Sequence, residues 1–362
     1  MKRTIQYKLL FYFLLVPFLA IANSAEVNYK STKEKTISKS FAVNKNATLE
    51  VSNSFGNINV ISWNENKIDF EISIKVSGNN DEKIEERLDG IDVEFKSSSD
   101  LVSAITNIEK NKSNWWNWGK KMNLKMEIDY VIKVPMSNNV FLQNRFGAIV
   151  LDKLEGDVKI NCEHGKITTK ELLSSNNEIK MSHTKDSYFE YIKSGEISAS
   201  HSRLTISNSD NIALKGQHSQ ISIENTENIG FKCQHGSLKV DKVNTIEGKA
   251  QHLTMRVGEL LSKADLNTAH GSLKISMMTP NVKEVDIESQ FTGITIGYNN
   301  AASFNFDLDF QFGSLRDSEG FVFRNKESNM HNKKYKGYYG TENSGNVVRI
   351  DSQHGSVSFK QK

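Results

Sequence analysis

Proline is scarce in this sequence, with only 3 among 362 residues. Asparagine is abundant instead, and 22 residues are glycine. Asn and Gly form turns because they tolerate positive φ, and unlike Pro they do not interrupt the hydrogen bonds of a sheet. The hydrophobic fraction of 37% is enough to build a sizeable core, which excludes wholesale disorder. The composition therefore favours many short strands.

Long apolar runs are also missing. The longest runs from Leu9 to Ala22 and is shorter than the roughly 18 residues that a membrane-spanning helix needs. Basic residues, among them Lys2 and Arg3, precede it, and small residues follow it, which is the pattern of a secretory signal peptide. We predict that residues 1–25 are removed on export. The remaining chain would have no transmembrane anchor and would reach the periplasm or the cell surface of a bacterium.

An excess of one charge sign is absent once the signal peptide is removed. The formal net charge of +3 comes from 46 basic and 43 acidic residues. The predicted signal peptide contains three of the basic residues and none of the acidic ones, so the exported chain is neutral. Because binding to nucleic acid depends on a basic excess that displaces counterions from phosphates, we predict no nucleic-acid partner.

The motifs that mark common enzymes and cofactor sites are missing as well. The sequence has no Gly-x-Ser-x-Gly, His-Glu-x-x-His, Cys-x-x-Cys, Gly-x-Gly-x-x-Gly or phosphate-binding loop. We predict no catalytic residue and no cofactor. The alternative is a carbohydrate-active enzyme, which would need converging acidic groups such as Asp307 and Asp309. Most acidic positions change from one repeat to the next, so a solvated exterior explains them better.

What the sequence does contain is a repeat marked by histidine and phenylalanine. A typical unit reads His235-Gly236-Ser237-Leu238-Lys239-Val240, a ring followed by a small residue and alternating apolar residues. From Phe146 to Phe312 the units follow one another every 17–21 residues, and the gap from Phe312 to His354 equals two such steps. The marked positions are Phe55, Phe146, His164, His183, His201, His218, His235, His252, His270, Phe291, Phe312 and His354.

A short fixed period filled with alternating apolar residues is typical of a solenoid. We predict an all-β parallel β-helix or β-roll of about a dozen coils, each of 17–21 residues. Residues 141–362 would form the repeats. Residues 26–140 would form a less regular N-terminal β region, with a helix at 81–88 capped by Asn80 and a Trp-rich loop at 114–121.

The two cysteines test this spacing. Cys162 and Cys233 each stand two residues before a repeat histidine and lie four repeats apart. At about 4.8 Å per strand, that separation is about 19 Å, whereas a disulfide needs Cα atoms within about 7 Å. We predict that both are free, buried thiols that pack as small hydrophobic groups.

The regularly spaced histidines allow two interpretations. Imidazoles are common ligands of zinc, copper and nickel, so His201, His218, His235, His252 and His270 are candidate metal ligands. Phe takes the same position in other repeats, however, and Phe cannot bind a metal. That exchange favours a structural stack of flat, partly buried rings at a bend in the chain.

Three of the four tryptophans cluster at Trp115, Trp116 and Trp118. Exposed Trp clusters bind carbohydrates, membrane interfaces or proteins. The same side chains would also suit a loop that covers the open end of the repeats. Both interpretations stay open, and the cluster is a candidate binding site.

Four segments carry a resemblance to a known family. They are the run from Leu49 to Val60 followed by Trp63, the sequence Gly337-Tyr338-Tyr339-Gly340, the sequence Val348-Arg349-Ile350, and the terminal His354-Gly355-Ser356-Val357. These segments resemble the bacterial candidate-adhesin family, a group of exported β-helical domains of unknown function. The resemblance implies a right-handed parallel β-helix and an adhesin-like role, and it supplies no catalytic residue.

Taken with the predicted export, the resemblance leads to one functional prediction. The protein would be a non-enzymatic binding or scaffold protein at the bacterial surface or in the periplasm. Its partner would be a surface, a glycan or an envelope protein. A signalling scaffold in the envelope is a further alternative, beside the carbohydrate-active enzyme.

Overall fold

A computed structural model describes residues 29–109 and 124–362. The predicted signal peptide and the predicted Trp-rich loop, with Trp115, Trp116 and Trp118, lie outside these ranges. Within them the protein is all-β, with one sheet of 23 strands and a single helix. None of the described helical structure is long and apolar enough to cross a membrane.

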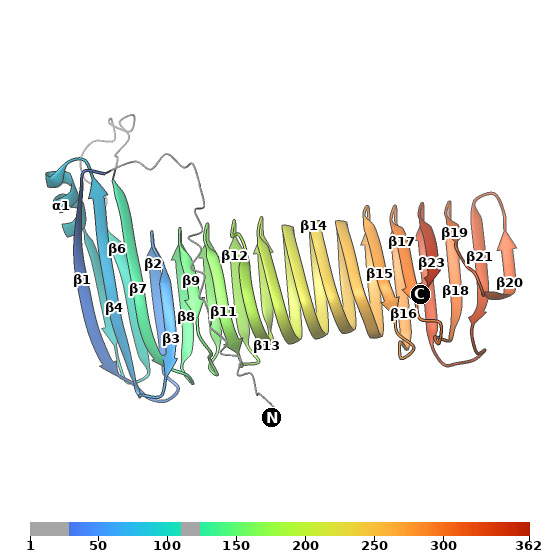
Figure 1. Cartoon of the computed structure of the whole chain (residues 1–362), viewed down its shortest axis with the longest axis horizontal. Coiled ribbons are helices and arrows are strands. Elements are labelled where there is room, and N and C mark those ends of the chain that lie inside the picture. The colour runs from blue at the N-terminus through green and yellow to red at the C-terminus, as the bar shows by residue number, and fades with distance from the viewer. Residues whose placement is uncertain (1–28, 110–123) are drawn as a thin grey trace, which may run out of the picture.

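The sheet forms an elongated barrel with two walls (Figure 1). In spatial order, the first wall consists of β5 (Ile91–Ser97), β6 (Leu101–Ile108), β2 (Thr48–Ser54), β8 (Asn139–Arg145), β10 (Val158–Glu163), β12 (Asn177–Ser182), β13 (Ser187–Ser200), β14 (Arg203–Ala269), β16 (Glu284–Gln290), β22 (Val347–Gln353), β18 (Phe304–Gln311), β21 (Asn332–Tyr339) and β20 (Val322–Ser328).

The second wall shares β13 and β14 with the first, because these two long strands bend from one wall into the other. Its order is β1 (Ser31–Ala42), β4 (Lys67–Gly78), β7 (Lys125–Pro135), β3 (Ile58–Trp63), β9 (Ala148–Leu151), β11 (Lys166–Leu172), β13, β14, β15 (Ser272–Met278), β17 (Gly293–Tyr298), β23 (Ser356–Gln361) and β19 (Ser314–Arg316).

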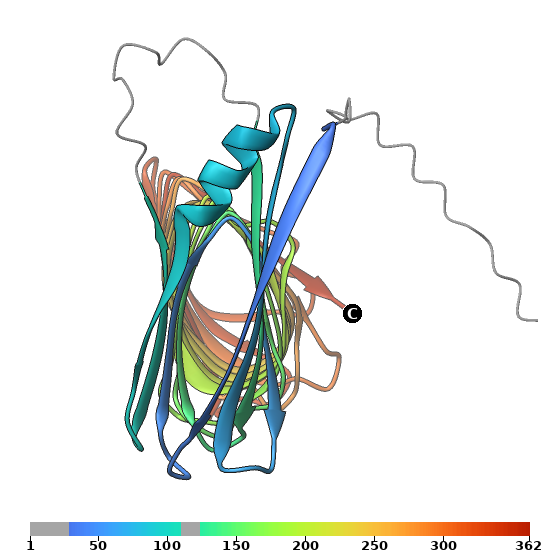
Figure 2. The ribbon, with the colours of Figure 1, turned by 90° about the vertical axis from the view of Figure 1, so that its left-hand side faces the viewer.

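Alternation along each strand places apolar side chains inside the barrel. In β10, Val158, Ile160 and Cys162 are buried, whereas the side chain of Lys159 is exposed. This period of two is the normal geometry of a strand with one wet face. Figure 2 shows the walls end-on as a ring of ribbons, and side chains of one continuous hydrophobic core fill its interior.

In the middle of the barrel, neighbouring strands are parallel and about one sequence repeat apart. Ile160 of β10 pairs with Leu142 of β8 on one side and with Ile179 of β12 on the other. The same register continues from β12 into β13 and from β13 into β14. Equivalent residues of successive repeats therefore form straight rows along the barrel.

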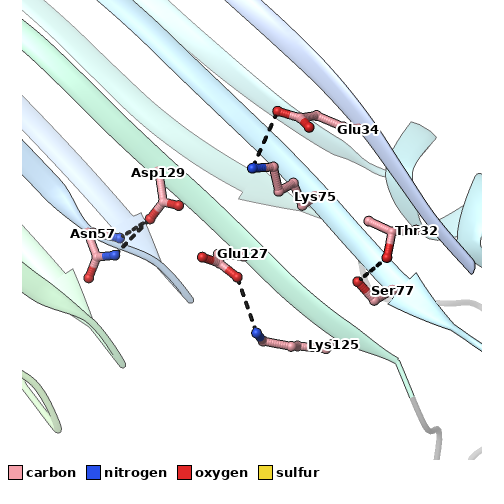
Figure 3. Close-up of polar contacts among 8 residues, drawn as sticks. All are labelled: Thr32, Glu34, Asn57, Lys75, Ser77, Lys125, Glu127 and Asp129. Atoms are coloured by element: carbon pink, nitrogen blue, oxygen red, sulfur yellow. Dashed lines mark hydrogen bonds and ion pairs between the residues drawn. The ribbon is translucent and has the colours of Figure 1, made fainter. Parts of the chain in front are cut away.

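At both ends the strands turn antiparallel. Near the N-terminal end, β1 and β7 both pair antiparallel with β4, and β5 pairs antiparallel with β6. Figure 3 shows the polar outer face of this region, where Asn57 donates two hydrogen bonds to the Asp129 carboxylate, at 2.8 and 3.0 Å. At the other end, β18, β21 and β20 form an antiparallel meander.

The prediction of a right-handed parallel β-helix or β-roll solenoid is therefore wrong. The chain forms one sheet of mixed strand orientation that curls into a nearly closed barrel (Figure 2). The sequence period gives the distance along the chain between equivalent residues. Strands one period apart pair in parallel only in the middle of the barrel. In the two end regions hairpin connections reverse the chain, because antiparallel strands can be joined by short turns.

The order of the last strands also differs from the predicted order. The sequence predicts that the His354 repeat follows the Phe312 repeat. In the structure, β22 lies between β16 and β18, and β23 lies between β17 and β19. Figure 1 accordingly shows the C-terminus before the end of the barrel, with β18 to β21 beyond it. The final segment of the chain is thus inserted between two earlier repeats.

The single described helix, α1 (Asp81–Asp89), packs against β4 and β1 at the N-terminal end of the barrel (Figure 1). Asn80 caps it by accepting a hydrogen bond from the backbone N–H of Lys83 at 3.0 Å. Ile84 and Leu88 lie four residues apart, so both side chains point from one face into the core. The helix covers apolar side chains that no further strand protects.

Candidate functional site

The repeat His and Phe residues stand where the first wall bends into the second, and their rings form one continuous stack. We call this stack the ring row. In spatial order it consists of Phe55, Phe146, His164, His183, His201, His218, His235, His252, His270, Phe291, His354 and Phe312. Adjacent ring centroids are 4.7–5.3 Å apart, and adjacent ring planes are inclined by 2–24°.

Every residue of the ring row adopts the left-handed backbone conformation, with φ between 49° and 64°. This conformation costs a non-glycine residue about 1–2 kcal/mol, although His tolerates it better than most. Hydrogen bonds between neighbouring strands hold it in place: the N–H of His270 donates to the Gln290 carbonyl at 2.9 Å, and the N–H of Phe291 donates to the Gln353 carbonyl at 2.8 Å. Each ring therefore occupies the equivalent position at the bend of its repeat.

A glycine, serine or threonine follows every ring except His252, which Leu253 follows, and at the glycine positions the backbones of neighbouring repeats meet closely. Gly236 shows this most clearly: it has a φ of 137°, and a Cβ atom at this position would lie 2.0 Å from the Ser219 carbonyl oxygen. Serine occupies the same place after His201 and His218. The Oγ atoms of Ser202 and Ser219 form hydrogen bonds with nearby backbone groups. The bend therefore forms at these positions without glycine.

All rings of the row except the half-buried Phe55 are exposed, whereas the sequence predicted partly buried rings. Phe146, Phe291 and Phe312 are 41%, 52% and 51% exposed, and the histidines of the row are exposed as well. Alternation explains the difference, because the residues two before each ring already occupy the interior. A ninth histidine, His331, also packs on Phe312 with centroids 4.8 Å apart. Its sequence context gave no signal, since it lies outside the repeat.

Stacking limits what the histidines can do chemically. An imidazole nitrogen binds a metal in the plane of its ring, and the planes of His218, His235 and His252 are within 3° of parallel. Their lone pairs cannot converge on one ion unless the rings rotate out of the stack. Among residues 29–109 and 124–362, no group of three or more His, Cys, Asp or Glu is arranged to hold a metal. His201 and His270 sit in the same stacked geometry.

Beside the ring row, the first wall is hollowed into a shallow groove. Two adjoining stretches of about 460 and 450 Å³ share Asn161 and Lys180. We call them together the first-wall groove. The residues three before successive rings line it: Ser52, Gln143, Asn161, Lys180, Ser198, Lys215 and Lys232. One side chain from each neighbouring strand thus enters the groove at a regular spacing.

The groove combines apolar, amide and basic groups. Near the N-terminal end, the half-buried Phe141 and Ile105 lie beside Gln143 and Lys159. Further along, Gln217 and Gln234 stand between the lysines and the rings. Glu178 pairs with Lys159 at 3.0 Å and also with Lys180, and these two lysines lower the pKa of the Glu178 carboxyl. The charges are therefore ordered in rows instead of scattered.

The acidic pair weighed as a possible enzyme site is neutralised in the structure. Asp307 and Asp309 do share the outer face of β18. Lys336 lies 2.8 Å from the Asp307 carboxylate, and Lys334 lies 2.6 Å from that of Asp309. Both lysines come from the neighbouring strand β21, so the two carboxylates stabilise the antiparallel meander.

The two cysteines are buried and unpaired. Cys162 and Cys233 lie inside the barrel, each two residues before a ring, in repeats separated by three intervening rings. Burial raises the pKa of the Cys162 thiol to about 12 and that of Cys233 to about 11. Because the thiolate is the reactive form, these groups are chemically inert in the folded protein.

Comparison with known proteins gives likenesses at the level of structure. No protein-family model matches the chain, and no curated protein matches its sequence. Nine chains of solved structures match. They include a candidate cell adhesion protein from Clostridium sporogenes, which is 11% identical, covers 91% of this chain and 100% of that chain, and has a TM-score of 0.21.

Two further matches are similar in extent. A candidate adhesin from Bacteroides fragilis is 12% identical over 91% of this chain and 97% of that one, with a TM-score of 0.26. A candidate lipid binding protein from Parabacteroides distasonis is 10% identical over 90% and 96%, with a TM-score of 0.34. The predicted resemblance to bacterial candidate adhesins is confirmed as a likeness. At these TM-scores it assigns neither a family nor an activity.

Proposed function

We propose that the protein is an exported, non-enzymatic binding protein of the adhesin-like kind. In this proposal the ring row and the first-wall groove form the surface that meets its partner. The observation that carries the proposal is the ring row itself: exposed aromatic side chains are held in a strained backbone conformation along most of the barrel. Strained and exposed residues that persist in a rigid scaffold are typical of functional surfaces.

The shape of this surface favours an elongated partner. The groove and the ring row run along the barrel, and their side chains recur at the strand spacing of about 4.8 Å. A polymer with a repeating unit, such as a glycan chain on a cell surface, would meet the same set of groups many times. Weak contacts that repeat in this way add up to useful affinity.

The N-terminal part of the groove offers the most varied chemistry. Phe141 provides an apolar face, Gln143 and Asn161 provide amide groups, and Lys159 provides a charge. Aromatic side chains with a few polar neighbours are the usual composition of a recognition surface. We therefore assign the first contact with the partner to this part of the groove.

A glycan panel tests the proposal. The purified protein should bind at least one surface polysaccharide without releasing reducing or unsaturated ends. Binding should weaken about tenfold or more when Phe141→Ala and Phe146→Ala are combined, because the loss of both aromatic side chains should cost at least about 1.4 kcal/mol in total. The control is Tyr188→Ala on the second wall, a residue of comparable exposure at 39%. It should leave binding unchanged.

Two results would contradict the proposal. Release of reducing or unsaturated ends from any polysaccharide would identify an enzyme. Equal loss of binding in the groove variant and in the Tyr188 control would show that the groove is not the contact surface. Circular dichroism and thermal melting of each variant establish that the fold is intact before binding is compared.

Export is a separate part of the proposal and rests on residues 1–25 of the sequence. Expression of the full chain in a bacterium, followed by fractionation, should yield a protein that lacks these residues outside the cytoplasm. The N-terminus of the recovered protein is read by mass spectrometry. An unprocessed chain in the cytoplasm would remove export from the proposed function and leave the binding surface untouched.

A further inference from the structure

One row of outward-facing residues on the first wall is basic in one half and acidic in the other. We call this the charged row; it consists of the residues that stand three before each ring. In spatial order it reads Lys215, Lys232, Lys249, Asn267, Glu288, Asp351 and Asp309. Direct pairing of Asn267 with Glu288, of Glu288 with Asp351, and of Asp351 with Asp309 establishes the order of its acidic half.

A second row next to it is symmetric about the same strand. We call this the amide row; it consists of the residues that stand one before each ring. Its order is Gln217, Gln234, Gln251, Ala269, Gln290, Gln353 and Gln311. Three glutamines lie on each side of Ala269, just as three lysines and three carboxylates lie on either side of Asn267. Glutamines within the row already bind one another, since Gln234 donates to Gln251 at 3.1 Å.

The innermost charges of the charged row have no partner in the described part of the chain. Lys215 pairs with Glu196, and Asp309 pairs with Lys334. Lys232, Lys249, Glu288 and Asp351 form no ion pair with any residue in 29–109 or 124–362, and all four are exposed. Glu288 receives only a hydrogen bond from Asn267.

The acidic half is electrostatically unfavourable in a single copy. Partial burial, together with the charges of Asp309 and Glu288, raises the pKa of Asp351. Three neighbouring strands thus place the carboxylates of Glu288, Asp351 and Asp309 side by side, and among the described residues Lys334 is the one cation paired with them. Exposed like charges at the strand spacing repel each other, and a cation from outside would relieve this repulsion.

We propose that a second copy of the chain supplies that cation, with the two barrels packed first wall to first wall and running antiparallel. The two-fold axis lies parallel to the strands and passes through Asn267. This operation places Lys249 of each copy opposite Glu288 of the other, and Lys232 opposite Asp351. It also places the glutamines of one amide row opposite those of the other. A two-fold contact needs such a self-complementary surface.

The neighbouring charges define how wide this contact is. On the same wall, Glu247, Asp265 and Asp286 lie two residues further from the rings. Across the axis, Glu247 of one copy would face Asp286 of the other, and the two Asp265 carboxylates would face each other, so these contacts would be repulsive. The contact is therefore confined to the charged and amide rows. From Lys215 to Asp309 it is about 29 Å long at about 4.8 Å per strand. An interface of this small size gives a weak, salt-sensitive dimer.

The dimer leaves the proposed binding surface accessible at its N-terminal part. Ser52, Gln143 and Asn161 lie beyond Lys215 on the side away from Asn267. Because the copies run antiparallel, their two N-terminal groove regions would lie at opposite ends of the dimer. Two separate binding surfaces on one particle would raise avidity for a polymer or a cell surface.

Charge reversal provides a sharp test. One variant carries Lys232→Glu with Lys249→Glu, and a second carries Glu288→Lys with Asp351→Lys. Each alone should lose dimerisation, because both of the intermolecular pairs closest to the axis become repulsive. An equimolar mixture should form a heterodimer, since both contacts then pair opposite charges. Sedimentation velocity measures the mass of each sample, and one variant carries a fluorescent label so that the mixed species is identified.

Two further measurements use high salt and a variant that carries all four substitutions. The unmodified dimer should dissociate in about 1 M salt, where the Debye length falls to about 3 Å. The chain that carries all four reversals should dimerise again, which shows that the fold tolerates the changes. Asp265→Asn, on the two-fold axis, should strengthen the dimer.

A monomer at all protein concentrations in low salt, or a dimer that both double variants retain, would overturn the proposal. So would a mixture of the two variants that stays monomeric. Loss of glycan binding in a variant that still dimerises would affect the proposed function alone, so the two proposals fail separately.

Discussion

The middle of the barrel and its C-terminal end bury different kinds of side chain. In the middle, each repeat contributes aliphatic residues such as Leu238 and Val240, which are enclosed by the repeats before and after them. At the end, no repeat follows. There the interior is filled by an aromatic cluster that includes Tyr298, Phe304 and Tyr339, with ring centroids 4.7–5.7 Å apart.

The difference follows from what each region must cover. A middle strand has a hydrogen-bonded neighbour on both sides, so small aliphatic groups fill the layer between two walls. An end strand leaves one side of the core open to water, and large rings bury more apolar area per residue. The N-terminal end follows the same principle, with Phe41, Phe70 and Phe95 packed together.

The largest loss of stability is expected when a buried ring is removed from the C-terminal end, where Phe310 packs against Tyr335. Phe310→Ala should lower the free energy of unfolding by about 3–5 kcal/mol, because the ring is completely buried and leaves a cavity. The control is Phe312→Ala, only two residues away, whose ring is 51% exposed on the ring row. It should cost less than about 1 kcal/mol. Urea denaturation measures both, and equal losses would contradict the assigned end cluster.

A middle repeat should be most sensitive at its bend. Gly236→Ala should destabilise by about 2 kcal/mol or more, because a Cβ atom would lie 2.0 Å from the Ser219 carbonyl oxygen. Gly293→Ala is the matched control. It lies two residues after Phe291, where a Cβ atom would meet nothing within 4 Å. The melting temperature of the Gly236 variant should be clearly lower than that of the Gly293 variant. An unchanged melting temperature in the Gly236 variant would refute the close approach of the two backbones.

The smallest effect concerns the thiols of the middle region. Burial raises the pKa of Cys162 to about 12 and that of Cys233 to about 11, while an unfolded cysteine ionises near 8.5. The stability that comes from burying the neutral thiols is present below about pH 8.5 and is lost as the pH rises towards their pKa values in the folded protein. Ellman's reagent should find no reactive thiol in the native protein at pH about 8 and two after unfolding. Fast native labelling would contradict the burial.

Local patterns predicted much of the middle. The spacing of His and Phe placed the rings in one row, and alternation identified Ile160 and Leu238 as core residues. Asn80 and the spacing of Ile84 and Leu88 were enough to locate the helix. Each of these signals depends on residues within one strand, one turn or one repeat, where sequence distance and spatial distance are closely related.

The ends were less predictable because their pairing is long-range. Phe55 stacks on Phe146 although 90 residues separate them, and His354 enters between Phe291 and Phe312. Nothing within either repeat indicates which strand edge it will meet. The sequence placed the rings at a bend but predicted them partly buried, because the residues of one repeat do not show how far neighbouring repeats cover a ring.

The scarcity of proline, the period of 17–21 residues and the alternation of apolar residues already determine that the chain forms strands with one buried face. They do so because side-chain direction in a strand depends only on the neighbouring residues. Tertiary structure decided the rest: the antiparallel ends, the nearly closed barrel and the place of the final strands. These depend on which unpaired edges meet, and the same contacts bring together the charged row on the first wall.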